Sequence, residues 1–201
     1  MKIILITHPD YLEDEQSLIN EMFEKGLCLL HLRKPGYDRE SLSEYLGDIK
    51  WNFHSRIVIH SCYDLVHDYN LRGIHITGVN TGEKRSIISR FKKTEDISIS
   101  FSYHALEDLD SLNTGIDYIF LSPVFDSISK KNYKARFNHA ELARALKRSN
   151  VDVIALGGCR EDNIKKIKEL GFSGAAVLGA IWNSRDPVNS FLSINRCAAE
   201  C

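Results

Sequence analysis

A repeated alternation of short apolar runs and longer polar segments constrains this chain more than any other feature of its sequence. The runs have about the length of single strands, and most are rich in Ile, Val and Leu without strict polar alternation. Such runs are typical of strands buried on both faces of a parallel sheet. Eight of them occur, at residues 3–6, 28–32, 57–59, 74–76, 97–101, 118–121, 153–156 and 175–178.

The segments between the runs have the spacing of helices. Residues 13–25 are a clear case, because their apolar side chains fall on one side and Gly26 follows as a stop signal. Strands that alternate with helices predict βαβ crossovers and a parallel sheet. Further helices are expected around residues 42–49, 142–146 and 162–170 and from residue 186 onward.

Eight such units predict an α/β fold of the (β/α)8 TIM-barrel type, built as a single domain over residues 1–201. An open doubly wound sheet is the main alternative, because periodicity counts the units without showing that the sheet closes. No linker, low-complexity tract or charge block divides the chain.

The charge balance limits the classes of partner. With 26 Lys and Arg against 27 Asp and Glu, the formal net charge is -1, which argues against a nucleic acid or an anionic membrane. No apolar stretch approaches the roughly 18 residues of a membrane span. The five cysteines lack zinc or redox spacing and fit a reducing compartment. We therefore expect a cytoplasmic protein, and the sequence leaves open whether it forms homo-oligomers.

Two loops after predicted strands carry the cations and hydroxyls that bind phosphate. One follows the second run and the other follows the sixth. Arginine can hold a phosphate through two parallel hydrogen bonds, and hydroxyls beside a lysine add donors to a charge. Ordinary solvated turns have a similar composition, so that alternative stays open here. The residues concerned are His31, Arg33 and Lys34 in the first loop and Ser127, Ser129 and Lys130 in the second.

Two turns of small residues predict a second kind of anion site. Gly157 and Gly158 follow the seventh run, and Gly179 follows the eighth. Glycine lets backbone N–H groups approach an anion, and a helix N-terminus adds about half a positive charge. Phosphate sites in barrels are often built from the loops after strands 7 and 8. We expect the two turns to converge on one phosphoryl group.

The eight histidines show no metal-ligand spacing, so no metal ligand is predicted. His60 and His75 stand at or near strand ends and are interpreted as structural or hydrogen-bonding residues. The chain also lacks a Walker loop, a GxGxxG dinucleotide turn and a nucleophile elbow.

Several of these segments resemble the family of thiamine phosphate synthases and their thiazole tautomerase relatives. The most specific stretch is DYIFLSPVF at residues 117–125 with SISK at 127–130, which is similar to the family's DYxxxGPVF-x-TxTK signature. The resemblance runs from residue 3 to about residue 181. Shorter matches are VIALGG at 153–158 to VxAIGG, AVLGAI at 176–181 to AVxSAI, ISFSYH at 99–104 to IGxSxH and GIHI at 73–76 to GVHLG.

The resemblance implies a TIM barrel that joins hydroxymethylpyrimidine diphosphate to thiazole phosphate, releasing diphosphate and forming thiamine phosphate. In that family diphosphate leaves first and the thiazole nitrogen attacks the pyrimidine carbocation. The protein's part is then to position the substrates and stabilise the departing charge. The loops and the resemblance together assign catalysis to Arg33, Ser102 and Lys130, and substrate binding to His31, Lys34, His60, Ser127, Ser129, Gly157, Gly158, Leu178 and Gly179.

The chain departs from the family pattern where magnesium is held. The family's QLREK is HLRKP here, so its final lysine is Pro35. Its Asn-Asp pair is His60-Ser61, and its second acidic ligand aligns at Asn80. Mg²⁺ prefers carboxylates and substrate phosphates, so a magnesium cofactor would be held here chiefly by the substrate.

These departures leave two alternatives to a synthase. The first is an isomerase like the thiazole tautomerases, which needs no magnesium. The catalytic histidine of that branch aligns with Pro123, so His31, His60 or His104 would have to serve as the base. The second is a non-catalytic binder of thiazole phosphate or thiamine phosphate, which would keep the phosphate turns without the carboxylates.

Overall fold

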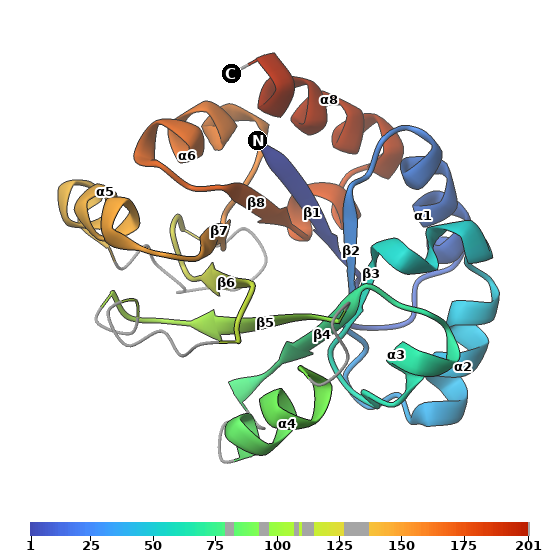
Figure 1. The fold of residues 1–201 in the computed structure, drawn as a ribbon. Helices are drawn as coiled ribbons and strands as arrows, with labels where there is room; N and C mark the ends of the chain where they lie inside the picture. The colour runs from blue at the N-terminus through green and yellow to red at the C-terminus, as the bar shows by residue number, and fades with distance from the viewer. Residues whose placement is uncertain (79–82, 93–96, 107–108, 110–114, 127–136, 201) are drawn as a thin grey trace.

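The eight strands close into a barrel. Our computed structural model describes residues 1–78, 83–92, 97–106, 109, 115–126 and 137–200. Each strand lies parallel to the next in sequence order, and β1 pairs with β8 (Figure 1). The predicted TIM barrel is confirmed, and the open doubly wound sheet is wrong. The strands are β1 Lys2–Ile6, β2 Leu29–Leu32, β3 Ile57–Ile59, β4 Gly73–Ile76, β5 Ser98–Tyr103, β6 Tyr118–Leu121, β7 Asp152–Leu156 and β8 Gly174–Val177.

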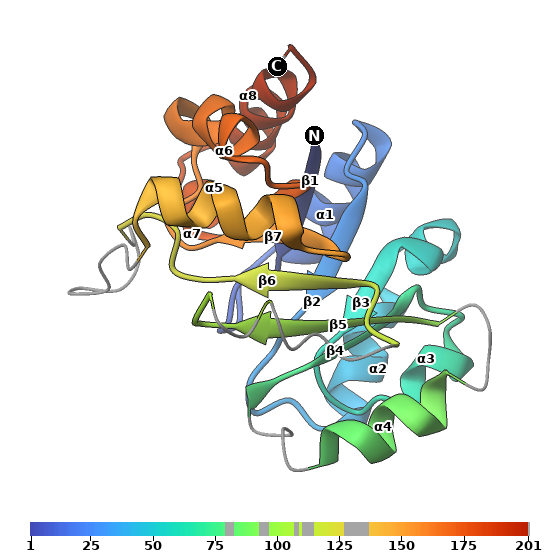
Figure 2. The same cartoon turned by 60° about the vertical axis from the view of Figure 1, so that its left-hand side comes forward.

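The helices lie outside the strands, as Figures 1 and 2 show. Local signals explain several of their ends: the Asp38 carboxylate accepts from the Ser41 amide at the start of α2, and Gly171 ends α6 in the left-handed conformation. The helices are α1 Glu15–Glu24, α2 Arg39–Gly47, α3 Leu65–Asp68, α4 Lys84–Phe91, α5 His139–Arg148, α6 Ile164–Leu170, α7 Gly179–Trp182 and α8 Pro187–Glu200, with 3-10 helices at Trp51–Arg56 and Glu161–Asn163.

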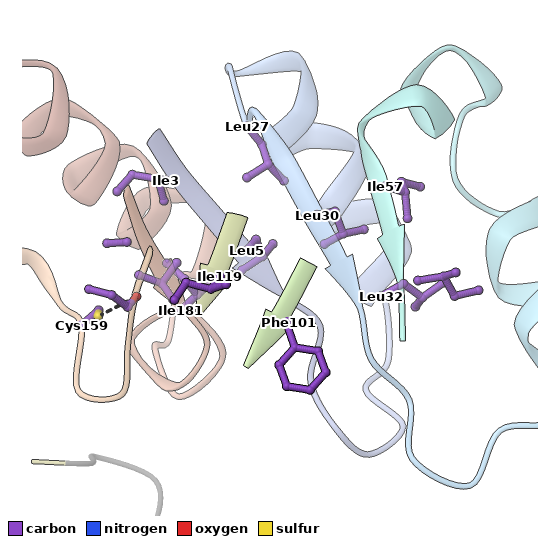
Figure 3. Packing of buried hydrophobic residues seen from close by; sticks show 14 of the residues in the cluster. Ile3, Leu5, Leu27, Leu30, Leu32, Ile57, Phe101, Ile119, Cys159 and Ile181 are labelled. Carbon is purple, nitrogen blue, oxygen red and sulfur yellow. Dashed lines mark hydrogen bonds between the residues drawn. The ribbon is translucent and has the colours of Figure 1, made fainter. Parts of the chain in front are cut away.

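One set of strand side chains packs beneath the helices. Because successive residues of a strand point to opposite faces, every second residue belongs to this outer layer. Ile3, Leu5, Leu30 and Leu32 are members, each at most 1% exposed (Figure 3). This layer forms the main hydrophobic core.

The other set of strand side chains fills the barrel interior, which is divided in character. An apolar part is formed by side chains of β1, β6, β7 and β8, namely Ile4, Ile6, Phe120, Ile154 and Ala176. The part formed by β2 to β6 is polar, with buried histidine rings from β2 and β4 and buried hydroxyls from β5. The buried polar side chains of the interior therefore lie on β2 to β6, which we call the polar sector of the barrel.

The two ends of the chain meet beside β1. The Met1 amino group donates to the Ala198 carbonyl of α8 at 3.1 Å, and the Trp182 indole donates to the Ile6 carbonyl at 2.7 Å. These contacts fix α7 and α8 against the first strand. Among the described residues, no helix has both the length and the apolar character needed to cross a membrane.

Candidate active site at the carboxyl end of the barrel

The turns after β7 and β8 are neighbours. The two strands run parallel, with Leu156 paired to Ala176. Gly158 and Leu178 each follow two residues later, so both turns leave the sheet at its carboxyl end. The two turns therefore lie side by side, as a shared anion site requires.

The turn after β7 has a shape that only glycine permits. Gly157 and Gly158 have φ angles of 90° and 68°, in the left-handed region. A Cβ on Gly158 would lie 2.4 Å from the Asp126 carbonyl oxygen and 2.8 Å from the Phe125 Cβ. The Asn163 side chain donates to the Gly158 carbonyl at 2.8 Å, which holds the turn from the other side. The turn is thus wedged between the loop after β6 and the start of α6.

The turn after β8 presents the first amides of α7. The Leu178 carbonyl accepts from the amides of Ile181 and Trp182, each at 3.0 Å. The amides at the start of a helix have no acceptor within it, so those of Gly179 and its successor remain available to an anion. The α7 helix has only one turn, and its anchor to β1 through the Trp182 indole keeps these amides in place.

Arg33 is held by its backbone at the end of β2. The Thr7 hydroxyl donates to the Arg33 carbonyl and accepts from the Arg33 amide, both at 2.9 Å, and Thr7 is fully buried. The Arg33 residue itself is exposed. Burial is the main cause that lowers the pKa values of His60 and His75, and the Arg33 charge contributes to both shifts. The predicted phosphate-binding arginine therefore stands at the carboxyl end.

We expect Thr7→Val to lower the free energy of unfolding by about 1–3 kcal/mol, because a buried N–H and C=O of Arg33 lose their partner while the side-chain shape is kept. Urea unfolding monitored by circular dichroism measures the change. A variant as stable as the wild type would show that water replaces the hydroxyl without cost.

The placement of Lys34 disagrees with its predicted role in substrate binding. Its side chain is 0% exposed, and its ammonium lies 2.5 Å from the Glu15 carboxylate of α1, which is 1% exposed. The same ammonium donates to the Asp10 carbonyl at 2.8 Å. Just after the end of β2, Lys34 is buried against α1, whereas its neighbour Arg33 is exposed at the carboxyl end of the barrel. The Lys34 ammonium therefore pairs with the Glu15 carboxylate inside the protein and is not available to a phosphate.

Three histidines that are distant in sequence meet inside the barrel. His31, His60 and His75 lie on β2, directly after β3 and on β4, and at most 7% of each residue is exposed. The ring centroids are 5.1 Å apart for His31 and His60, 5.4 Å for His31 and His75, and 4.3 Å for His60 and His75. Spacing along the chain gave no sign of this group, although His60 and His75 do make the side-chain hydrogen bonds expected of them.

A hydrogen-bonded network joins two of the rings to a tyrosine. Nδ1 of His31 lies 2.9 Å from Nε2 of His60, and Nε2 of His31 lies 2.6 Å from the Tyr118 hydroxyl. Nδ1 of His60 is buried without a hydrogen-bond partner among the described residues. A proton on Nε2 of His60 satisfies both contacts and leaves only a lone pair at Nδ1. The opposite placement would bury an unpaired N–H, at a cost of about 1–3 kcal/mol.

The third ring is fixed by serine hydroxyls. Nδ1 of His75 lies 2.8 Å from the Ser100 hydroxyl, and Nε2 lies 2.9 Å from the hydroxyl of Ser102, a predicted catalytic residue. Burial lowers the pKa of His75 to about 3, with a smaller contribution from the Arg33 charge. Burial also holds the pKa values of His31 and His60 well below the usual value. All three imidazoles are therefore neutral at neutral pH.

The described residues do not fit Mg²⁺. Within them, no Asp or Glu joins a group of three or more potential metal ligands, and the group that does form consists of the three histidines. Mg²⁺ prefers oxygen ligands, which imidazoles cannot supply. Ser61 is half-buried and has no carboxylate. The predicted site residues Ser127, Ser129 and Lys130, and the aligned Asn80, lie outside the described residues.

The family model for thiamine monophosphate synthase matches residues 3–181, which include both turns, Arg33 and the three histidines. The chain belongs to this family. Thiamine-phosphate synthase from Clostridium tetani is 28% identical over 193 residues, covering 92% of this chain and 89% of that relative. The enzyme of the same name from Staphylococcus haemolyticus is 29% identical over 186 residues, covering 87% and 84%.

Solved structures of similarly named proteins share the fold. Thiamine phosphate pyrophosphorylase from Bacteroides thetaiotaomicron is 33% identical, with a TM-score of 0.81 over 99% of this chain and 98% of that one. The corresponding protein from Pyrococcus furiosus has a TM-score of 0.82 at 18% identity, which shows the fold alone. The predicted resemblance to the thiamine phosphate synthase family is confirmed.

Sequence reasoning about this family member missed Thr7, Ser100 and Tyr118 as parts of the site. One signal could have found Ser100. The segment Ser98–Tyr103 alternates polar and apolar residues, with Ser98, Ser100 and Ser102 on one face, and Tyr118 begins the next strand. Such alternation in a barrel strand indicates a polar interior.

Proposed function

We propose that this member of the thiamine monophosphate synthase family joins hydroxymethylpyrimidine diphosphate to thiazole phosphate, releasing diphosphate and forming thiamine phosphate. The observation that carries the proposal is the pair of neighbouring turns at Gly158 and Gly179, which offers backbone amides to one phosphoryl group at the carboxyl end of the barrel. The names of the relatives support a synthase over an isomerase or a non-catalytic binder.

The roles follow from where charge sits during the reaction. The turn amides would hold the thiazole phosphate, which stays intact, while Arg33 would meet the diphosphate as its negative charge grows on leaving. Fixed donors that favour the separated charge lower the barrier without reorganising. Because β2 and β8 flank β1 on opposite sides, Arg33 and the two turns would hold the two phosphate groups apart. Ser127, Ser129 and Lys130 remain predicted partners of the diphosphate.

The test is a reaction of the purified chain with both substrates and a divalent cation. We expect thiamine phosphate and diphosphate to appear in equal amounts. Product that forms only when both substrates are present establishes the transfer. A folded chain that makes neither product, with Mg²⁺, Mn²⁺ or Zn²⁺, would reject the proposal. Aromatisation of a thiazole carboxylate phosphate by that chain would instead support the isomerase.

We expect Arg33→Gln to lower kcat/KM for the diphosphate substrate about 10- to 100-fold, the value of one charge-assisted contact of about 1.5–3 kcal/mol. Arg33→Lys should fall between this variant and the wild type, because it keeps the charge and loses the second parallel hydrogen bond. Steady-state kinetics provide the measurement.

The matched control is Lys25→Gln, which removes an exposed cation at the end of α1 and should leave kcat/KM unchanged. The exposed Arg33 side chain should also leave the unfolding free energy within about 0.5 kcal/mol of the wild type. Equal activity of Arg33→Gln and the wild type would exclude a role of this charge in catalysis.

A further inference from the structure

We propose that His31, His60 and His75 form a binding site for a divalent transition-metal ion of the zinc class. The three residues lie on or directly after the neighbouring strands β2, β3 and β4, and one potential ligand nitrogen of each lies within 4.8 Å of the others. Three imidazoles leave one position of a tetrahedral site open to water or to a substrate oxygen. The proposal goes beyond the synthase activity and does not rest on it.

The distances already approach those of a metal centre. Zn–N bonds of about 2.0–2.1 Å place tetrahedral ligand nitrogens roughly 3.4 Å apart and the ring centroids about 5.2 Å apart. The observed centroid separations of 5.1, 5.4 and 4.3 Å lie on both sides of that value. The His60 and His75 rings, which are stacked with an interplanar angle of 23°, would have to move apart by about 1 Å to reach that separation.

One unused lone pair in the cluster, at Nδ1 of His60, is available to a metal ion. Nδ1 of His60 has no hydrogen-bond partner among the described residues, although His60 is only 7% exposed. Nδ1 of His31 and Nε2 of His60 share a single proton across 2.9 Å. A metal ion at Nδ1 of His60 would use the free lone pair while Nε2 keeps its proton toward His31, and neutral imidazoles are the form that binds metals.

The surroundings match those of metal-bound histidines. A coordinating imidazole usually keeps its second nitrogen hydrogen-bonded to another group, which orients the ring. Tyr118 provides that group for His31, and Ser100 or Ser102 provides it for His75. Arg33 follows His31 by two residues at the end of β2, so a second positive charge stands near the cluster. An anionic fourth ligand, such as hydroxide or a phosphate oxygen, would balance the two cations.

The proposed site would use histidine nitrogens as metal ligands in place of the carboxylates that hold Mg²⁺ in the family pattern. Among the described residues no carboxylate joins a group of three or more potential ligands, whereas three histidine nitrogens lie together on or directly after β2, β3 and β4. Imidazole ligands favour Zn²⁺, Co²⁺, Ni²⁺ or Cu²⁺ over Mg²⁺. We therefore expect the protein to select an ion of this group.

The experiment titrates the chelator-treated full chain with Co²⁺ and then with Zn²⁺, in the absence of substrates. We expect one Co²⁺ per chain, with the visible absorption of a tetrahedral nitrogen and oxygen site, displaced by Zn²⁺. His60→Asn and His31→Gln should each weaken binding at least 100-fold. X-ray absorption of the zinc-loaded wild type should show imidazole nitrogens at about 2.0–2.1 Å, a result that does not depend on any variant folding.

Two controls separate this site from adventitious binding. His67→Gln changes an exposed histidine of α3 and should bind Co²⁺ like the wild type. Cys62→Ser should also bind normally, with no cobalt–thiolate charge-transfer band in either protein. The proposal is overturned if the folded wild type binds neither ion. It is equally overturned if the folded His60→Asn chain retains the spectrum, or if Cys62→Ser abolishes it. Synthase activity is a separate measurement, so either proposal can fail alone.

Discussion

Replacing Lys34 by methionine is expected to lower the free energy of unfolding by about 3–5 kcal/mol, the usual cost of leaving one partner of a buried ion pair uncompensated. The Lys34 and Glu15 side chains are 0% and 1% exposed, so water cannot replace the lost ammonium. The Asp10 carbonyl loses its donor in the same variant. Urea unfolding followed by circular dichroism measures the effect.

Two companion variants make the Lys34 result specific. Lys50→Met breaks an ion pair with Glu24 in which both side chains are about half exposed, and it should cost less than about 1 kcal/mol. The double change Lys34→Met with Glu15→Leu removes both buried charges and should recover at least half of the lost stability. If Lys34→Met were stable but lost synthase activity, the sequence-based role in substrate binding would be restored.

We expect Gly158→Ala to lower kcat/KM at least 100-fold, mainly through a higher KM for thiazole phosphate. The added Cβ would lie 2.4 Å from the Asp126 carbonyl oxygen, so the turn or the loop after β6 must move by several tenths of an ångström or more. Displacement of a binding group by about 1 Å can cost a factor of 100 in rate. The φ of 68° adds strain of about 1–3 kcal/mol.

Gly171→Ala is the matched control for this turn. Gly171 has a φ of 101°, and a Cβ there would meet only the Leu146 Cβ, at 3.8 Å. The backbone strain is thus similar, but no backbone clash follows and the residue lies at the end of α6. We expect lower stability with unchanged kcat/KM. Normal kinetics of Gly158→Ala, measured with both substrates varied, would show that this turn does not hold the phosphate.

The strands could be predicted because their signal is local. Each of the eight apolar runs became a strand within one or two residues of its expected bounds, since a segment buried on both faces must be apolar wherever it stands in the sheet. No local feature of the sequence showed that the sheet closes into a barrel. The pairing of β1 with β8 joins segments more than 170 residues apart, and an open sheet would have used the same runs.

The site was predictable only in part, because the direction of each side chain decides whether that residue can reach a ligand. Arg33 and Lys34 are adjacent cations, and both suggested a phosphate ligand. A carboxylate 19 positions earlier, at Glu15, binds the Lys34 ammonium inside the protein and makes Lys34 a structural residue. The family motifs could not reveal this difference, because they record residue types in order and not their directions.

The sequence by itself determined the eight units, their parallel direction and the glycine turns, because apolar periodicity and left-handed backbone conformations are properties of short segments. The tertiary structure alone decided that the sheet closes, that Lys34 is internal and that His31, His60 and His75 share one sector of the barrel. These outcomes depend on contacts between residues far apart in the chain, whose distances are set only when the strands pair.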